Sequence, residues 1–254
     1  LRMKERGLPY YGVSVKGDTD AWARSENLRL TGAGIEGILV LGEESVPFQS
    51  ELLGGHNLEN ILVAATAAHL LGASSSAIAK GIAATRRVAG RLEPVSHGGS
   101  VLVLVDYAHT PDALSRILEE IGELTKGRVI CVFGCGGDRD KTKRPEMGAA
   151  ASKGAHVIVV TSDNPRTEKP ETIIQDILKG INQDDTETFV EVDRALAITK
   201  ALGIAKGDDT VLIAGKGHED YQIIGTTRRD FSDRDVAERA LAKHRGDAQC
   251  GGGK

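Results

Sequence analysis

Residues 10–48 alternate between short apolar runs and turns that contain glycine. The runs are YYGVSV, NLRLTG and GILVLG, and no helical period appears among them. Short apolar segments separated in this way are typical of antiparallel strands. The sequence therefore predicts a small antiparallel sheet in the first part of the chain.

The pattern changes to a helical period at Asn57. In NLENILVAATAAHLLG the apolar residues recur at helical spacing, and Gly72 stands where a C-cap belongs. A second helix is predicted in SSSAIAKGIAAT, and the stretch 89–100, which contains proline and glycines, is the best linker candidate. We therefore expect one domain over residues 1–94 and a second over residues 95–254.

Apolar strands alternate with amphipathic helices beyond this linker. The predicted strands are SVLVLVDY, RVICVFG, HVIVVTSD, TFVEV and DTVLIAG, and each is followed by a predicted helix. Nearly continuous apolar strands separated by helices indicate a parallel sheet that is covered on both faces. The predicted fold class is α/β, with a mostly parallel, Rossmann-like sheet domain in the carboxy-terminal part.

Composition and charge argue against a nucleic-acid partner and against membrane insertion. The chain has 254 residues and a formal net charge of -4, which disfavours a nucleic-acid partner because such proteins usually present a basic surface. No apolar run approaches the ~20 residues that span a bilayer, and the first residues lack the apolar core of a secretory signal. We expect a cytosolic monomer that acts on small molecules and does not insert into a membrane.

The chain opens with LRMKERG and has no initiator methionine. This beginning leads us to expect that the chain is part of a longer protein. The three cysteines, Cys131, Cys135 and Cys250, are expected to be reduced and structural. A metal-binding or nucleophilic role for Cys135 is a less favoured alternative, because no paired CxxC accompanies it.

Small and charged residues follow the predicted strands. They read DYAHTP, GCGGDRDKTKRP, SDNPRTEKP and GKGHEDYQ. Ligands of an open α/β sheet bind outside the carboxyl ends of its strands, so these loops are the candidate site. The glycine-rich loop GCGGDRDKTKRP matches neither GxxxxGK[ST] nor GxGxxG, although its cations suit an anionic ligand.

The residue types in these loops suit an amino acid as ligand. Asp163 can hold an ammonium group, and the guanidinium of Arg166 can grip a carboxylate with two hydrogen bonds. Glu219 is a second acceptor for an ammonium group. Taken alone, the glycine-rich loop and GKGHEDYQ are explained at least as well as solvated turns, and the DNPR signal is modest because Asn-Pro is an ordinary turn former. The combination of these loops favours a site.

Asp106 ends the first predicted strand of the sheet domain. Asp106 could cap the helix that follows, but Thr110 and Asp112 are better placed to do so. A ligand role is therefore favoured for Asp106, whose carboxylate can accept hydrogen bonds from a ribose. His109 is evenly divided between a ligand contact and packing.

Taken together, the motifs resemble those of one enzyme family. GGHNLEN, GRLEPV, VDYAHTPDAL, FGCGGDRDKTKRPEMG, TSDNPRTEKP and AGKGHEDYQ occur in the order found in the Mur ligases that add the third residue of the peptidoglycan stem. The DNPR turn is similar to that of members that use meso-diaminopimelate rather than L-lysine. The resemblance covers nearly the whole chain after about Tyr10.

The resemblance implies an ATP- and Mg²⁺-dependent ligase that joins meso-diaminopimelate to UDP-N-acetylmuramoyl-L-alanyl-D-glutamate through an acyl phosphate. Residues 1–94 would be the end of a central ATP-binding domain, and residues 95–254 the carboxy-terminal, amino-acid-binding domain. The implied nucleotide-side residues are His56, Asn60, Arg91 and Asp106. The implied diaminopimelate residues are Arg139, Asp163, Asn164, Arg166, Gly215 and Glu219.

The chain departs from the family pattern in one respect. The amino-terminal domain, the P-loop, most magnesium ligands and the carbamylated lysine of the family have no counterpart in these residues, so we expect the chain alone to be inactive. A non-catalytic scaffold with this fold and a related ligase for folate or another stem residue are the alternatives. A nicotinamide-linked dehydrogenase is disfavoured because the dinucleotide fingerprint is missing.

Overall fold

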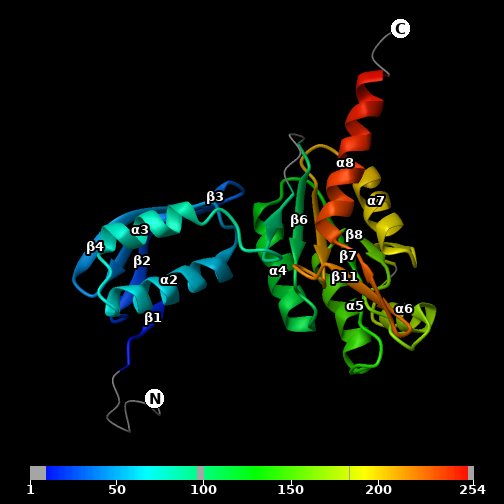
Figure 1. Ribbon diagram of the computed structural model, residues 1–254, viewed down its shortest axis with the longest axis horizontal. Helices are drawn as coiled ribbons and strands as arrows, with labels where there is room; N and C mark the ends of the chain where they lie inside the picture. Colours follow the sequence, from blue (N-terminus) through cyan, green and yellow to red (C-terminus); the bar gives the residue numbers. More distant parts are fainter. Residues whose placement is uncertain (1–9, 96–99, 183, 251–254) are drawn as a thin grey trace. The chain divides into compact units, whose positions relative to one another are not determined.

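The computed structural model describes residues 10–95, 100–182 and 184–250, with the backbone alone for 244–250 (Figure 1). The chain forms two compact units, Leu1–Val88 and Ala89–Lys254. The division precedes the boundary that we expected near Pro94, because Glu93 and Pro94 form strand β5, which pairs with β6 of the second unit. Part of the expected linker, residues 96–99, lies outside the described residues.

The first unit consists of a four-stranded sheet and two helices. Its strands are β1 (Val13–Ser14), β2 (Ala23–Thr31), β3 (Gly34–Leu41) and β4 (Glu44–Ser50), in that order. Strands β2 and β3 pair antiparallel as predicted, and β4 also pairs antiparallel with β3, whereas β1 runs parallel to β2. Strand β4 was not predicted, since Pro47 and its polar neighbours obscure the alternation that a strand usually shows.

Both predicted helices of this unit are present, as α2 (Gly55–Leu70) and α3 (Ser75–Ala84). Gly72 follows the C-cap of α2 with φ 95°, a left-handed conformation that glycine adopts without steric cost. The Ser74 side chain accepts a hydrogen bond from the Ala77 amide and so caps α3. Leu39, Phe48 and Leu62 are among the residues of the core between the sheet and the helices.

The second unit is built on a six-stranded sheet of order β5-β6-β10-β7-β8-β9. Its strands are β5 (Glu93–Pro94), β6 (Leu102–Asp106), β7 (Val129–Phe133), β8 (Val157–Val160), β9 (Glu187–Val190) and β10 (Thr210–Ala214). Every strand pair is parallel except β5–β6. The α/β fold class and the mostly parallel sheet predicted from the sequence are confirmed.

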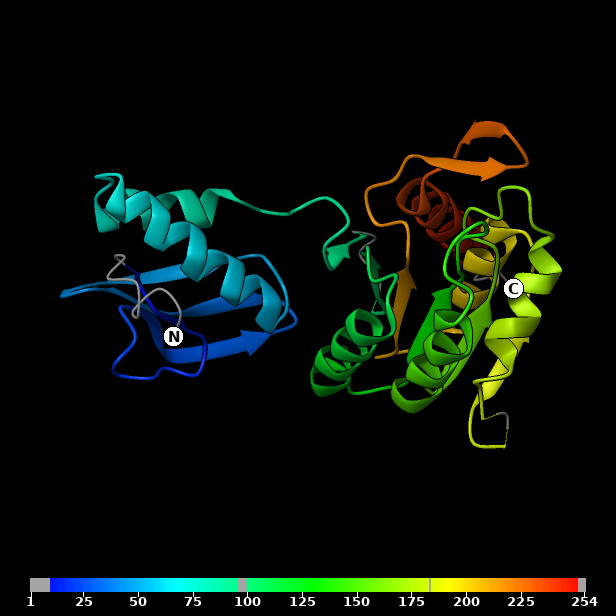
Figure 2. The same ribbon diagram turned by 90° about the horizontal axis from the view of Figure 1, so that it is seen from below.

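Helices cover both faces of this sheet, as Figure 2 shows. They are α4 (Pro111–Leu124), α5 (Lys143–Gly154), α6 (Pro170–Leu178), α7 (Arg194–Ile204) and α8 (Asp233–Cys250). Helices α7 and α8 pack on the face that carries Val105, Val132 and Ile213, and α4, α5 and α6 pack side by side on the other. No helix in the described ranges is both long and apolar enough to cross a bilayer.

A two-stranded hairpin, β11 (Tyr221–Ile224) and β12 (Thr227–Asp230), follows β10 and was not predicted. Strand β12 is exposed and reads TRRD, so it has none of the apolar alternation that identifies a strand. The hairpin places β11 against the loop that follows β8, with a bridge between Arg166 and Ile224. It therefore helps to shape the candidate site.

Ile213 is a test of the core of this sheet. It is fully buried and lies between Val105 of β6 and Val132 of β7. Ile213→Ala should lower the free energy of unfolding by roughly 2–5 kcal/mol, because it leaves a cavity in a packed interior. Urea unfolding followed by circular dichroism measures the change. Leu196→Ala, at a position of α7 that is 58% exposed, is the control and should change stability by no more than about 0.5 kcal/mol.

Candidate functional site

The four loops singled out in the sequence follow β6, β7, β8 and β10, whose carboxyl ends lie at the same edge of the sheet. The loops after β7 and β8 touch through their backbones. A Cβ atom on Gly134 would lie 2.2 Å from the Thr161 carbonyl oxygen, and one on Gly137 would lie 1.9 Å from that of Pro165. Glycine is therefore required at both positions, because any side chain would push the two loops apart.

Side chains lock the same two loops together. The Asp138 carboxylate accepts hydrogen bonds from the amide and the hydroxyl of Thr167, at 3.2 and 2.9 Å. In return, the Asp138 amide donates to Glu168 Oε1 at 2.7 Å. The fully buried Arg144 of α5 holds the two oxygens of Glu168 at 2.8 and 3.1 Å. The loops after β7 and β8 thus form one rigid element.

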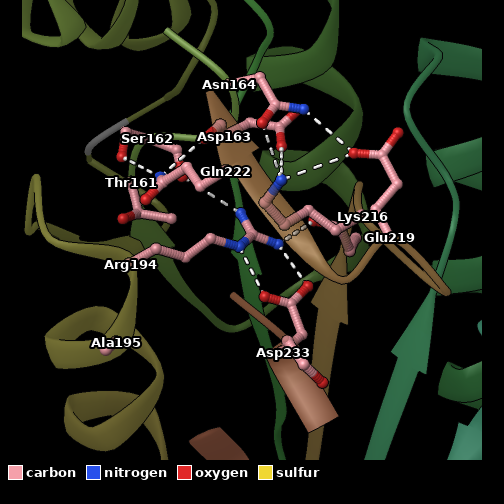
Figure 3. Close-up of polar contacts among 12 residues, drawn as sticks. Thr161, Ser162, Asp163, Asn164, Arg194, Ala195, Lys216, Glu219, Gln222 and Asp233 are labelled. Atoms are coloured by element: carbon pink, nitrogen blue, oxygen red, sulfur yellow. Dashed lines mark hydrogen bonds and ion pairs between the residues drawn. The ribbon is translucent and has the colours of Figure 1, made fainter. Parts of the chain in front are cut away.

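A buried lysine gathers three of the predicted site residues (Figure 3). The ammonium of Lys216 lies 3.2 Å from Asp163 Oδ1, 3.0 Å from Asn164 Oδ1 and 3.5 Å from Glu219 Oε2. Its side chain has no exposed surface, whereas those of Asp163 and Glu219 are 13% and 20% exposed. The two carboxylates thus combine a buried, neutralised side with a side that a ligand can reach.

Asn164 is tied into the protein by several hydrogen bonds. Its Oδ1 accepts from Lys216 and from the Ile223 amide at 2.9 Å, and its Nδ2 donates to Glu219 Oε2 at 3.0 Å. Asn164 is buried. In this arrangement its amide orients Lys216 and Glu219 and anchors strand β11.

Arg166 lies beside this cluster and is half-buried. Its backbone has φ 52° and is pinned to the hairpin by bonds from its amide to the Ile223 carbonyl and from the Gly225 amide to its own carbonyl. Nη1 donates to the Gly137 carbonyl at 2.8 Å. Among the described residues Nε and Nη2 have no hydrogen-bond partner, so this edge of the guanidinium remains for a ligand.

Arg139 and Gly215 complete the predicted amino-acid set. Arg139 is exposed, and its described hydrogen bond goes to the carbonyl of the preceding residue at 3.3 Å. A Cβ atom on Gly136 would lie 3.0 Å from Arg166 Nη1 and 3.7 Å from Arg139 Cγ, so the two arginines flank that glycine. Gly215 has φ 117° and donates its amide to the Asp106 carbonyl at 3.0 Å.

Asp106 and Arg91 lie at the β6 end of the same edge. The buried Asp106 carboxylate accepts hydrogen bonds from the Leu92 and Ala108 amides at 2.8 and 2.7 Å. The expectation that Thr110 caps α4 is confirmed, since its hydroxyl accepts from the Ala113 amide. Arg91 is exposed, with its guanidinium 5.4 Å from the centre of the Tyr107 ring.

For His109 the sequence left two roles open, a ligand contact and packing. The centre of its imidazole ring lies 4.6 Å from the centre of the Tyr107 ring. Its Nδ1 is 2.8 Å from the Tyr107 carbonyl oxygen. The other two predicted nucleotide-side residues, His56 and Asn60, lie on α2 of the first unit. Asn60 is exposed, and its Nδ2 lies 3.5 Å from Asn57 Oδ1.

Two buried cations that the sequence analysis did not single out support the site. One is Lys216, which lies in the AGKGHEDYQ motif but resembles the lysine of an ordinary solvated turn. The other is Arg194 of α7, which binds the Asp233 carboxylate at 2.7 and 2.8 Å and donates to the Ala214 carbonyl at 3.0 Å. No local pattern marks a cation as buried, so only the packing of distant segments identifies these two.

The described cysteines are free and buried, as expected. Burial raises the pKa of the Cys135 thiol to about 12, and it does the same for Cys131. A thiol with such a pKa is protonated at neutral pH, which argues against a nucleophilic Cys135. The Cys250 side chain lies outside the described part of the chain.

Comparison with known proteins identifies the class to which this fold and site belong. Residues 90–217, about half of the chain, match the family of the Mur ligase, glutamate ligase domain. The chain therefore belongs to the Mur ligase family, as its motifs suggested.

Its relatives include ligases that carry one specific name. The chain is 52% identical over 221 residues to the UDP-N-acetylmuramoyl-L-alanyl-D-glutamate--2,6-diaminopimelate ligase of Gloeobacter violaceus, covering 87% of this chain and 45% of that protein. It is 49% identical over 242 residues to the same ligase of Geobacter sulfurreducens, covering 89% of this chain and 47% of that protein. The chain thus spans about half the length of these relatives.

Solved structures agree with this assignment. A structure of a UDP-N-acetylmuramoyl-L-alanyl-D-glutamate--2,6-diaminopimelate ligase aligns with a TM-score of 0.68 and 35% identity, covering 96% of this chain and 50% of the other. A folylpolyglutamate synthase of Thermotoga maritima aligns with a TM-score of 0.61 at 18% identity, covering 84% of this chain and 47% of the other. The second likeness shows a shared fold.

Glu168 should make the stability of the locked loops depend on pH. Hydrogen bonds from Arg144 and from the Asp138 amide lower the pKa of this carboxyl from 4.5 to about 2. Because the folded pKa is the lower one, the stabilisation is present above the unfolded pKa and is lost as pH falls toward the folded pKa.

We expect Glu168→Gln to reduce stability at neutral pH, and the difference from the unchanged protein to shrink between pH 4.5 and pH 2. Urea unfolding at a series of pH values measures this difference. Glu123→Gln, at an exposed position of α4, is the control and should follow the unchanged protein. If the difference in unfolding free energy between the two proteins stays constant across this pH range, the ion pair between Glu168 and Arg144 does not cause the pH dependence of stability.

Proposed function

We propose that this chain supplies the amino-acid site of an ATP-dependent ligase that joins meso-2,6-diaminopimelate to UDP-N-acetylmuramoyl-L-alanyl-D-glutamate. The names of its relatives support the reaction. The arrangement around Arg166 supports the substrate. Because the chain spans only about half of those relatives, the activity belongs in this proposal to a full-length ligase that carries this segment.

The free edge of the Arg166 guanidinium is the observation that carries the proposal. Elsewhere in this protein the same edge, Nε with Nη2, binds a carboxylate: Arg194 holds Asp233 in this way, and Arg128 holds Asp209. In Arg166 the Gly137 carbonyl occupies Nη1 instead. The distal carboxylate of diaminopimelate is a planar partner that would fill the remaining edge with two parallel hydrogen bonds.

The distal ammonium of the same substrate finds its acceptors nearby. Asp163 and Glu219 each direct one oxygen at Lys216, and their side chains are 13% and 20% exposed. In this proposal the other oxygen of each carboxylate receives the substrate ammonium, and Arg139 adds positive potential for the substrate carboxylate. Lysine lacks the distal carboxylate, so it would leave the Arg166 edge unpaired and be used poorly.

Gripping one end of diaminopimelate leaves its other amino group to act as the nucleophile. The chain would then contribute by holding that amine in line with the activated carboxylate of the second substrate, which lowers the entropic barrier to attack. A cytosolic monomer is part of the proposal, since ATP and the UDP-linked dipeptide are cytosolic compounds.

The described residues do not supply the whole ATP and Mg²⁺ machinery of the proposed reaction. Across residues 10–95, 100–182 and 184–250, no three His, Cys, Asp or Glu side chains form a group that could hold a metal ion. The 254 residues also contain no GxxxxGK[ST] motif. In this proposal Asp106, Arg91, His56 and Asn60 therefore form only a share of the nucleotide site.

The chain studied alone provides one test. Because it lacks the phosphate-binding loop, the purified 254-residue chain should form no amide from ATP, the muramoyl dipeptide and diaminopimelate. The measurement is ADP release together with chromatography of the product, and a full-length diaminopimelate ligase is the positive control. Turnover by the chain at a rate comparable to that control would contradict the assignment.

Arg166 provides the sharper test. In a full-length ligase carrying this segment, Arg166→Ala should lower kcat/KM for diaminopimelate by a factor that corresponds to roughly 2 to 5 kcal/mol, the range for removing one partner of a buried charge pair. The KM for ATP should hardly change, and lysine should gain relative to diaminopimelate. Arg116→Ala, on the exposed side of α4, is the matched control. An unchanged ratio of kcat/KM for diaminopimelate to kcat/KM for lysine would mean that Arg166 does not bind the distal carboxylate.

A further inference from the structure

Lys216 is a fully buried cation at the centre of the candidate site, and it has no role in the function proposed above. Four oxygens lie within 3.5 Å of its ammonium nitrogen: Asn164 Oδ1, the Tyr221 carbonyl oxygen, Asp163 Oδ1 and Glu219 Oε2. The ammonium group donates hydrogen bonds to Asn164 Oδ1 and to the Tyr221 carbonyl oxygen, and it forms ion pairs with the two carboxylates. Lys216 is therefore engaged by the protein and is not a group that waits for a ligand.

The two carboxylates depend on Lys216 in turn. Oδ1 of Asp163 is buried and forms no hydrogen bond with the described residues, so the ion pair with Lys216 is its compensation. Glu219 Oε2 receives Lys216 and Asn164 together. A buried charge that loses its partner is strongly unfavourable, and two carboxylates at one site repel each other. Without Lys216 both groups would have to turn away from their present positions.

The link also crosses the sheet. Lys216 belongs to the loop after β10 and Asp163 to the loop after β8, and β7 lies between those strands. Figure 3 shows Lys216 extending to Asp163 and Asn164, while the second oxygen of Glu219 points away from it. One side chain thus sets the positions of carboxylates from two separate loops.

We propose that Lys216 is a positioning residue for the ammonium group of the amino-acid substrate. It fixes Asp163 and Glu219 so that each offers one oxygen outward, and it cancels one of their two charges. The cluster then carries a single net negative charge, which one substrate ammonium neutralises. This inference rests on the proposed function, because it takes the ligand to be an amino acid with a distal ammonium.

The test uses Lys216→Met in a full-length ligase that carries this segment. The KM for diaminopimelate should rise about 10- to 100-fold, because displaced acceptors no longer meet the ammonium, while the KM for ATP stays within about two-fold. Lys216→Arg should restore part of the loss, since it returns the charge in a different shape.

Arg128→Met is the matched control, since it removes an ion pair with Asp209 ahead of β7 and β10, at the opposite edge of the sheet. It should lower the melting temperature and leave the KM for diaminopimelate unchanged. If Lys216→Met also lowers only the melting temperature, Lys216 is a structural residue and the inference is wrong.

Arg166→Ala, measured in parallel, separates this inference from the proposed function. If Arg166→Ala weakens the use of diaminopimelate and Lys216→Met does not, only the role of Lys216 is refuted. If neither variant affects it, both the inference and the proposed amino-acid site are refuted.

A charge-balanced pair covers the case in which Lys216→Met yields no folded protein. Lys216→Met with Asp163→Asn removes one charge of each sign, and it is compared with Asp163→Asn alone. A KM for diaminopimelate several-fold above that of Asp163→Asn, on the order of 5-fold, supports the role of Lys216 through Glu219. Equal KM values for the two variants overturn it.

Discussion

Strand β10 pairs in parallel with β6 on one side and with β7 on the other, and the candidate site depends on this placement. The pairing brings the loop after β10, which follows the other loops in sequence, close to those after β7 and β8. Lys216 can then reach Asp163, and Gly215 can donate to the Asp106 carbonyl. A β10 strand at the edge of the sheet would separate the two halves of the cluster.

Buried charge in this unit is concentrated where loops have to be held together. Lys216, Arg194 and Arg144 have side chains with no exposed surface, and each is met by one or more carboxylates. Burying a cation is costly unless its donors are satisfied, so each forces the segments that supply its acceptors into one arrangement. Arg194 joins α7 to the start of α8 and the end of β10, whereas Arg144 joins α5 to the loop after β8.

Hydrogen-bond and ion-pair partners also distinguish the structural residues from those that are available to a ligand. Asn164 and Lys216 use their polar atoms within the protein, whereas Arg166 keeps one edge of its guanidinium and the side chains of Asp163 and Glu219 stay partly exposed. In the proposed function these groups bind a zwitterion, which presents a carboxylate and an ammonium at one carbon. Recognition of both charges lets a site discriminate against a ligand that has only one of them.

Local patterns in the sequence determined the helices, the parallel strands of the second sheet and the loops that form the candidate site, because these depend on apolar periodicity and glycine placement. Strands β4, β5, β11 and β12 were missed, since pairing with a neighbour and not their own composition makes them strands. Asp163, Arg166 and Glu219 were proposed as site residues from their chemistry, whereas Lys216 and Arg194 were not singled out. Whether a lysine is solvated or buried depends on which distant oxygens surround it, and only the tertiary structure brings those oxygens together.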